Sequence, residues 1–221
     1  MMFLSFLQAV KRVNETALTI LYEDDHLLVC VKPRGILSAA DASGKSSVAD
    51  LLLPRTIYPV HRLDRDTCGL LVLAKTQACA AFLSGMLGNG FCKEYLAVCE
   101  GCPAEEGELT DLLFHDRSRN KTYIVRRKRA GVKEARLSYR VLHAGERSVL
   151  QVRLFTGRTH QIRVQFASRG YPLVGDRKYG ASTTGFLQLY AWRLQFPHPD
   201  GRSLCFTLPE EFLPEEIRKG L

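Results

Sequence analysis

The sequence has no run of about 18 apolar residues, the length that a helix needs to cross a bilayer, so we expect no transmembrane helix. Its start also lacks the charged leader and cleavage site of a secretory signal peptide. Neither a GxGxxG motif nor a P-loop lysine motif occurs, so no nucleotide cofactor is implied. These absences favour a cytoplasmic protein with no membrane partner.

Paired cysteine motifs are also missing. The seven cysteines are an odd number and are scattered through apolar stretches, which favours reduced, buried thiols over a disulfide framework. Cys99 and Cys102 form a single CxxC without a second CxxC or paired histidines nearby. A structural zinc ion needs about four ligands, so we expect no metal site, although zinc binding through this pair stays open as an alternative.

The chain does have a surplus of positive charge. With 31 Lys and Arg against 23 Asp and Glu, the net charge is +8, and the isoelectric point is about 9.2. This balance indicates a polyanionic partner, either nucleic acid or an acidic membrane face, while the alternative is an ordinary solvated basic surface. The length of 221 residues, with 46% apolar residues and no low-complexity linker, predicts one domain over 1–221. The sequence does not indicate the oligomeric state, and we take a monomer as the default.

Hydrophobic patterning predicts an α+β fold with a mainly antiparallel sheet, because strands and hairpins outnumber helices and no βαβ repeat is visible. A strand–turn–strand unit is expected within 18–33, a buried strand at 69–74, and further strands at 91–101, 108–114, 135–143 and 147–155. A hairpin is expected around Asp200 and Gly201. Helices are expected near the N-terminus, within 46–53 with Ser46 or Ser47 as N-cap, at 77–90, at 159–170 with Thr159 as N-cap and Gly170 as stop, and within 209–220.

The segment HRLDRDTCGLLVLAKT, residues 61–76, places Asp64 five residues before the buried strand at 69–74. A carboxylate at the mouth of such a strand faces the cleft that the sheet presents, and a buried carboxylate needs a cation or several donors. The alternative is that Asp64 and Asp66 cap a turn and pair on the surface with Arg62 and Arg65.

The segment GRTHQIRVQFASRGYPLVGDRKYG, residues 157–180, puts Arg163 beside the apolar stripe of a helix that includes Ile162 and Phe166. A cation at the edge of a core usually has a carboxylate partner. The alternative is an amphipathic helix on which Arg163 extends its charge into solvent.

In KEYLAVCEG, strand alternation puts Tyr95, Ala97 and Cys99 on one face, with Lys93 beside them. A tyrosine at such a position is most often part of the core. It gains functional interest if its face meets Asp64.

The segment 117–133 contains eight basic residues and no acidic one, with Asn120 and Tyr123 interleaved. This composition is typical of a phosphate-contacting loop. The alternative is a disordered, solvated loop. We assign RNA binding to seven of its cations: Arg117, Arg119, Lys121, Arg126, Arg127, Lys128 and Arg129.

Taken together, these motifs resemble pseudouridine synthases of the RluA type. The segments quoted above, with ILYEDDHLLVCVKPRGILS before them and LQLYAWRLQFPHPDG after them, follow the order of that family over about residues 20–209. Cys68 stands where serine is usual, and Gln165 and Tyr190 stand where histidine is frequent, which leaves the chemistry intact. Because the resemblance begins so early, we expect no small N-terminal RNA-binding domain, so RNA affinity must come from the catalytic domain.

The resemblance implies a pseudouridine-synthase-like fold with flanking helices and a central active-site cleft. It also implies isomerisation of specific uridines in structured ribosomal or transfer RNA, without metal or cofactor. Asp64 would be the catalytic carboxylate, acting as nucleophile or as base, with Arg163 as its partner and Tyr95 stacking on the base. Substrate binding falls to Arg62, Ile162, His61 and Thr67.

Two other functions stay open from the sequence. A non-catalytic RNA-binding module would use the same fold and basic surface without needing Asp64, Tyr95 and Arg163. A glycosidase-like hydrolase would use Asp64 and Asp66 as a carboxylate pair and release free uracil.

Overall fold

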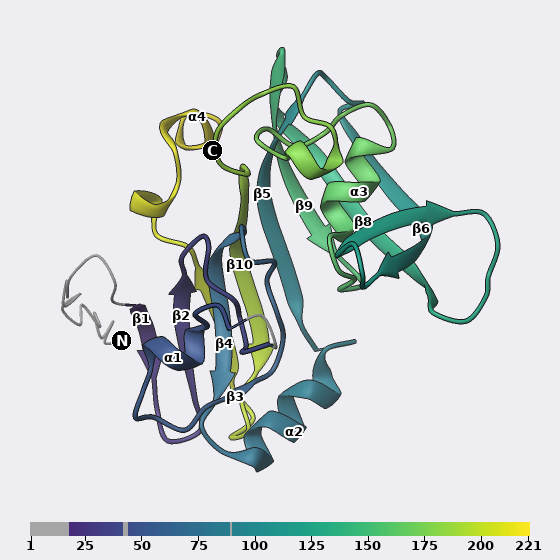
Figure 1. Cartoon of the computed structure of the whole chain (residues 1–221). Helices are drawn as coiled ribbons and strands as arrows, with labels where there is room; N and C mark the ends of the chain where they lie inside the picture. Colours follow the sequence, from purple (N-terminus) through teal and green to yellow (C-terminus); the bar gives the residue numbers. More distant parts are fainter. Residues whose placement is uncertain (1–17, 42–43, 89) are drawn as a thin grey trace.

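The computed structural model describes residues 18–41, 44–88 and 90–221, so the helix predicted near the N-terminus lies outside the described residues. Eleven strands form one sheet (Figure 1), in which nine follow the order β1-β2-β4-β10-β5-β9-β8-β6-β7. β11 pairs with β10, and β3 pairs with β4. The β4–β10 pair is parallel and the other strand pairs are antiparallel. The predicted α+β class with a mainly antiparallel mixed sheet is confirmed.

The strands are β1 (Thr19–Glu23), β2 (Leu27–Lys32), β3 (Tyr58–Pro59), β4 (Cys68–Ala74), β5 (Cys92–Glu100), β6 (Glu106–Asp116), β7 (Lys121–Val125), β8 (Val132–His143), β9 (Arg147–Leu154), β10 (Leu189–Pro197) and β11 (Ser203–Thr207). The helices are α1 (Val48–Leu51), α2 (Gln77–Met86), α3 (Gln161–Ala167) and α4 (Glu215–Arg218), with 3-10 turns η1 (Arg177–Tyr179) and η2 (Glu210–Phe212). Ser47 caps α1, as predicted.

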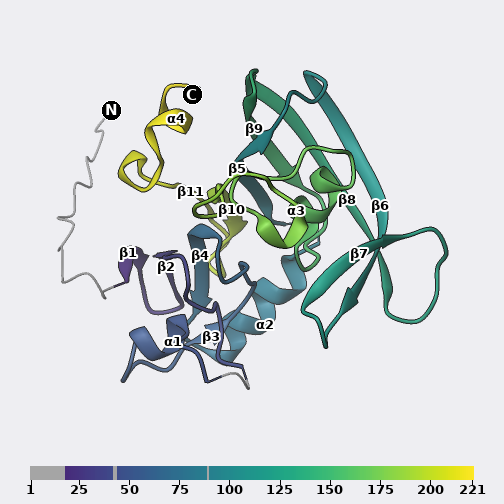
Figure 2. The same ribbon diagram turned by 45° about the horizontal axis from the view of Figure 1, so that its top comes forward.

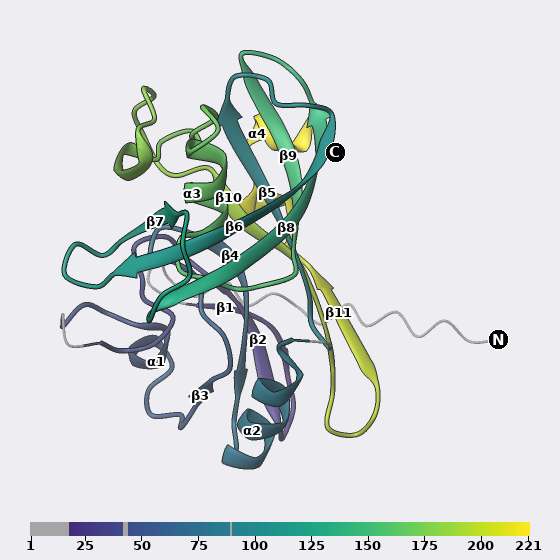
Figure 3. The ribbon, with the colours of Figure 1, turned by 90° about the vertical axis from the view of Figure 1, so that its right-hand side faces the viewer.

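Two large hydrophobic cores cover the two faces of the sheet, and a third, small cluster joins Leu113, Ala135 and Val164. Alternating residues of β2 and β4 enter different cores: Leu28 and Leu71 join one, while Leu27 and Leu70 join the other. Because both faces are covered, these strands read as continuous apolar runs rather than as alternating patterns. Figure 3 shows the long twisted strands β5, β9, β8 and β6 following one another across the sheet.

Gly69 allows the parallel pairing of β4 with β10, which joins β1, β2, β3 and β4 to the rest of the sheet. Its φ is +127°, and a Cβ atom there would overlap the backbone of Ala191 on β10. Glycine is therefore required at the start of β4, directly after the loop that carries Asp64.

Helix α3 is buried along nearly its whole length and packs against β6, β7 and η1. Figure 2 shows it on the side of the molecule that holds β6 and β8. The prediction that Thr159 caps this helix is wrong. The N-cap is His160, whose left-handed φ of 54° sets the turn and whose carbonyl accepts from the Val164 amide. The predicted stop is confirmed, because Gly170 has a φ of +85° just after the helix ends.

Two other expectations need correction. The segment 117–133 is not a continuous loop, because residues 121–125 form β7 and pair with β6, with Tyr123 opposite Phe114. Its β-branched and aromatic side chains suit a strand despite the flanking charges. The single C-terminal helix predicted within 209–220 is split into η2 and α4, with Pro214 at the N-cap of the second.

Candidate active site

Asp64 lies in the loop between β3 and β4, at the edge of a cavity of about 610 Å³. Its carbonyl accepts a hydrogen bond of 3.1 Å from the amide of Thr67, which is buried. The Asp64 side chain is 16% exposed and faces the cavity. Asp66 forms a 3.0 Å ion pair with Arg65, and both side chains are more than 40% exposed. The two aspartates therefore do not form a carboxylate pair in one cleft.

The cavity brings the predicted catalytic and substrate-binding residues together. Its lining comes from the β3–β4 loop, the end of α2, strand β5 and the segment that leads from β9 into α3. The predicted residues that line it are His61, Arg62, Asp64, Thr67, Tyr95, Ile162 and Arg163. Sequence positions 64, 95 and 163 thus meet in one cleft, as expected.

Arg163 contacts Asp64, but its main partner is Asp176. Its Nε and Nη2 each donate a 2.7 Å hydrogen bond to the Asp176 carboxylate, and its Nη1 reaches Asp64 Oδ2 at 3.3 Å. The Arg163 and Asp176 side chains are 6% and 1% exposed. Burial alone would lower the pKa of Arg163, but the hydrogen bonds and charge of Asp176, together with Asp64, raise it above its ordinary value. The guanidinium is therefore a fixed positive charge beside Asp64.

His160 also faces Asp64, with 3.9 Å between its Nε2 and Asp64 Oδ2. Burial lowers its pKa to about 4, so it is neutral at pH 7 and this contact is not an ion pair. Its Nδ1 lies 2.8 Å from the Tyr179 hydroxyl, which accepts a 2.8 Å hydrogen bond from the Thr122 amide. The Tyr179 hydroxyl can therefore donate its proton to His160 Nδ1, which then acts as the acceptor. This favours the His160 tautomer whose N–H is on Nε2, toward Asp64.

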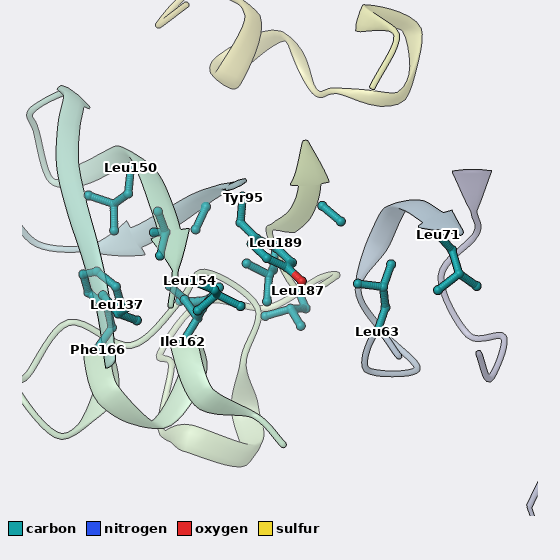
Figure 4. Close-up of a cluster of buried hydrophobic side chains, with 14 of the residues drawn as sticks. Leu63, Leu71, Tyr95, Leu137, Leu150, Leu154, Ile162, Phe166, Leu187 and Leu189 are labelled. Carbon is teal, nitrogen blue, oxygen red and sulfur yellow. The ribbon is translucent and has the colours of Figure 1, made fainter. Parts of the chain in front are cut away.

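Tyr95 lies on β5 and lines the same cavity as Asp64. It is 7% exposed, and Figure 4 shows it in the apolar cluster that also holds Ile162, Leu187 and Leu189. Burial, together with the negative charge of Asp64, raises the Tyr95 pKa above its ordinary value, so the phenol stays protonated at pH 7. The ring and Ile162 give the cavity an apolar wall.

The other predicted substrate-binding residues differ in how they meet the cavity. Arg62 is exposed at its edge. His61 accepts a 3.2 Å hydrogen bond from the Val72 amide through Nε2, and burial lowers its pKa to about 3, so it is neutral. Thr67 holds the Asp64 loop through its amide. The geometry of His61 and Thr67 suits positioning of the loop.

The predicted RNA-binding cations lie on the β6–β7 turn, on β7 and in the loop that follows it. Six of them are exposed: Arg117, Arg119, Arg126, Arg127, Lys128 and Arg129. Lys121 is half-buried at the start of β7. None of the seven lines the cavity. Arg119 approaches Asp116 at 3.9 Å and Arg129 lies 5.0 Å from the Phe114 ring centroid, so most of the positive charge on this hairpin faces solvent.

Thr122 connects that hairpin with the cavity. Its side chain donates a 2.9 Å hydrogen bond to the Thr159 carbonyl and lies 3.1 Å from His115 Nδ1, and its amide holds Tyr179. The hydrogen bonds therefore run from β7 through Tyr179 to His160, next to Asp64.

The sequence profile of RNA pseudouridylate synthases matches residues 26–168. The chain belongs to this family. Among its curated relatives, the dual-specificity RNA pseudouridine synthase RluA of Salmonella typhimurium is 33% identical over 90% of this chain and 96% of its own. Ribosomal large subunit pseudouridine synthase D of Nitrosomonas europaea is 36% identical over 90% of this chain and 63% of its own. An uncharacterized RNA pseudouridine synthase of Bacillus subtilis is 35% identical, and this chain spans 65% of its length. This chain thus spans less than two thirds of the length of the Bacillus and Nitrosomonas relatives.

Solved structures support the same fold. The human RNA pseudouridylate synthase domain containing 1 superposes with a TM-score of 0.76 over 95% of this chain and 90% of its own, at 22% identity. The human RNA pseudouridylate synthase domain containing 4 gives 0.73 over 91% of each chain, also at 22% identity. Within the described part of the chain, no helix is long and apolar enough to cross a membrane.

Sequence reasoning missed Asp176, His160 and Tyr179, although all three lie in the segment 157–180. GDRKYG places Asp176 three residues before Tyr179, and η1 brings both toward α3. A signal was available, since a buried arginine calls for a carboxylate, and Asp176 was the unassigned carboxylate of the same segment.

Proposed function

We propose that this chain converts uridine to pseudouridine in structured ribosomal or transfer RNA, with Asp64 as the essential catalytic carboxylate. One observation carries the proposal: Asp64 and Tyr95 line the same cavity of about 610 Å³, with the Arg163 guanidinium 3.3 Å from Asp64 Oδ2. A carboxylate, a fixed cation and a planar ring around one cavity suit a reaction on a single base and its sugar.

The reaction rearranges one nucleotide without gain or loss of atoms. The N1–C1′ bond breaks, the uracil turns within the cavity, C5 bonds to C1′, and the C5 proton leaves while N1 gains one. Asp64 can attack the electron-poor sugar carbon or take a sugar proton beside it. Arg163 stabilises the carboxylate that either role requires.

The apolar wall of the cavity suits the base. Tyr95 would stack on the uracil and keep it in place while the glycosidic bond is open. Ile162 would pack beside it, because it lines the same cavity next to Arg163. Since the Tyr95 phenol stays protonated, its ring rather than a phenolate is its main contribution.

The target uridine must leave its stack to reach Asp64. Arg62, exposed at the edge of the cavity, would fill the vacated space or contact phosphate. The seven cations of the β6–β8 region would bind the RNA backbone. We further propose that the chain acts as one catalytic domain, as a cytoplasmic monomer.

Mapping of pseudouridine tests the proposal. Total RNA from cells with and without the gene would be treated with carbodiimide and read by primer extension, with wild type or Asp64→Asn added back. We expect a stop that disappears on deletion and returns only with wild type. An unchanged stop pattern in ribosomal and transfer RNA, with purified protein inactive on their transcripts, would favour a non-catalytic RNA-binding role. Release of free uracil would instead favour a hydrolase.

A further inference from the structure

Lys93 lies in the candidate active site, and the roles proposed above do not use it. Strand alternation on β5 puts it on the same face as Tyr95, two residues away, and it lines the same cavity. Cα atoms two residues apart on a strand are about 7 Å apart. A group held by Lys93 would therefore lie one nucleotide unit or less from a base stacked on Tyr95.

The charged group that acts on Lys93 is a cation, Arg158. The Lys93 Nζ lies 3.4 Å from the position of a Cβ atom on Gly157, and the neighbouring Arg158 also lines the cavity. His61, which faces it from the β3–β4 loop, is neutral. Within the described ranges, the Lys93 side chain has no hydrogen bond or ion pair. The neighbouring carboxylate, Glu94, lies on the opposite face of β5 and accepts a hydrogen bond from Gln151. Burial, together with the charge of Arg158, lowers the Lys93 pKa.

An unpaired lysine that is half-buried loses part of its hydration, and a second cation beside it adds repulsion. An anion in the cavity would remove both penalties. Arg158 is suited to share such an anion, since its Nε donates 2.9 Å to the Glu134 carbonyl and holds the guanidinium in place. Lysine contacts phosphate as a point charge, and arginine contacts it as a planar fork.

We propose that Lys93 and Arg158 form a subsite for the phosphodiester that flanks the uridine stacked on Tyr95. The proposal rests on the proposed function, and it adds the part of the substrate that sets position in the cavity. The basic hairpin would bind RNA at a distance, whereas this pair would fix the reacting nucleotide itself.

Kinetics of variants tests the subsite on a transcript that the mapping has identified. Lys93→Met keeps the length of the side chain and removes its charge. We expect KM to rise roughly 10- to 100-fold, the range for one lost charge-assisted hydrogen bond, with kcat largely unchanged and with recovery in Lys93→Arg. The matched control is Lys219→Met, which removes an exposed lysine paired with Glu215 on α4 and should leave KM unchanged. A Lys93→Met enzyme with the KM of wild type would overturn the subsite.

Chemical change of the RNA separates phosphate binding from a general effect of charge. A single methylphosphonate beside the target uridine removes one negative charge. Wild type should bind the RNA more weakly when the critical phosphate, on the 5′ or 3′ side, is replaced. Lys93→Met has already lost the contact with that phosphate, so its affinity should be the same for the modified and the unmodified RNA. Equal losses for both enzymes at both positions would contradict the proposal.

A binding measurement keeps this test independent of turnover. In NMR spectra of protein with ¹⁵N-labelled lysine, assigned through Lys93→Met, the Lys93 signal should shift with uridine 5′- or 3′-monophosphate and not with uridine. If neither nucleotide moves the signal, the subsite is wrong even where RNA is modified. If the signal moves while no RNA contains pseudouridine made by this protein, the proposed function is wrong and the phosphate site stands.

Discussion

The guanidinium of Arg163 is bound to Asp176 through two hydrogen bonds of 2.7 Å, and only its remaining nitrogen, at 3.3 Å, reaches Asp64. The carboxylate that holds the arginine is therefore not the carboxylate proposed to react. This division leaves Asp64 near a positive charge without committing both of its oxygens, so it stays available to a substrate.

We expect Asp64→Asn to abolish turnover while keeping the fold and RNA binding. The amide keeps the shape of the side chain but cannot serve as a nucleophile or base, so activity should fall at least roughly 100-fold. Release of tritium from RNA labelled at uracil C5 measures turnover, and a filter-binding assay measures affinity. Activity equal to that of wild type would refute the role of Asp64.

Asp176→Ala should destabilise the protein by about 3–5 kcal/mol, because it leaves the buried Arg163 without its main partner. Chemical denaturation measures the change in the free energy of unfolding. The control is Asp66→Ala, which removes an exposed ion pair with Arg65 and should cost less than about 1 kcal/mol. Similar losses for the two variants would argue against Asp176 as the anchor of Arg163.

Tyr95→Ala should weaken RNA binding by about 1–3 kcal/mol, the range for one base stacked on an aromatic side chain. Tyr95→Phe keeps the ring and should bind nearly as well as wild type. Affinities of both variants would be measured in the Asp64→Asn background, well below the unfolding temperature, so that neither turnover nor unfolding contributes. Equal weakening by the two substitutions would mean that the hydroxyl, rather than the ring, contacts RNA.

Replacing Arg126, Arg127, Lys128 and Arg129 together by glutamine should flatten the dependence of RNA affinity on salt. Each lost phosphate contact should reduce the slope of log K against log salt by roughly 0.7–0.9. Because none of these residues lines the cavity, kcat at saturating RNA should be unaffected. An unchanged slope would place the RNA path elsewhere on the surface.

Glu100→Gln should reduce the loss of unfolding free energy that the protein shows as the pH falls below 4.5. Burial would raise the Glu100 pKa, but hydrogen bonds from Thr183 and Ser182 lower it to about 2. Because the folded pKa lies below the unfolded value near 4.5, the stabilisation is fully present above pH 4.5 and is lost as pH falls toward 2. Urea unfolding of both proteins should give a gap in stability at pH 6 that narrows below pH 4.5. A gap independent of pH would show that the Glu100 charge is not what anchors the 182–183 loop.

Much of the site was predictable because its chemistry is concentrated in short segments. Asp64, Tyr95 and Arg163 each follow from a local pattern, namely a charged residue at a strand mouth, a strand face, and a cation beside an apolar stripe. Their convergence on one cavity was expected from the family resemblance and is visible in the structure. The pairing of β4 with β10 was not predictable, since it joins residues about 120 positions apart.

Other features depend on backbone geometry that residue types do not specify. Thr159 has the side chain of a good N-cap, but its neighbour His160 takes the left-handed conformation and begins the helix instead. Asp176 shows the same limit, because its link to Arg163 depends on how the turn at η1 folds back on α3.

Strands β4, β10 and β5 are hydrogen-bonded in one continuous sheet, and residues of β5 and β10 line the cavity. A continuous sheet would make the protein stiff at a place where many enzymes close around their substrates. The distortion needed to bring a uridine to Asp64 would then fall on the RNA. The protein would then select uridines in stretches of RNA that bend and unstack easily. The mechanical compliance of the RNA would contribute to substrate specificity.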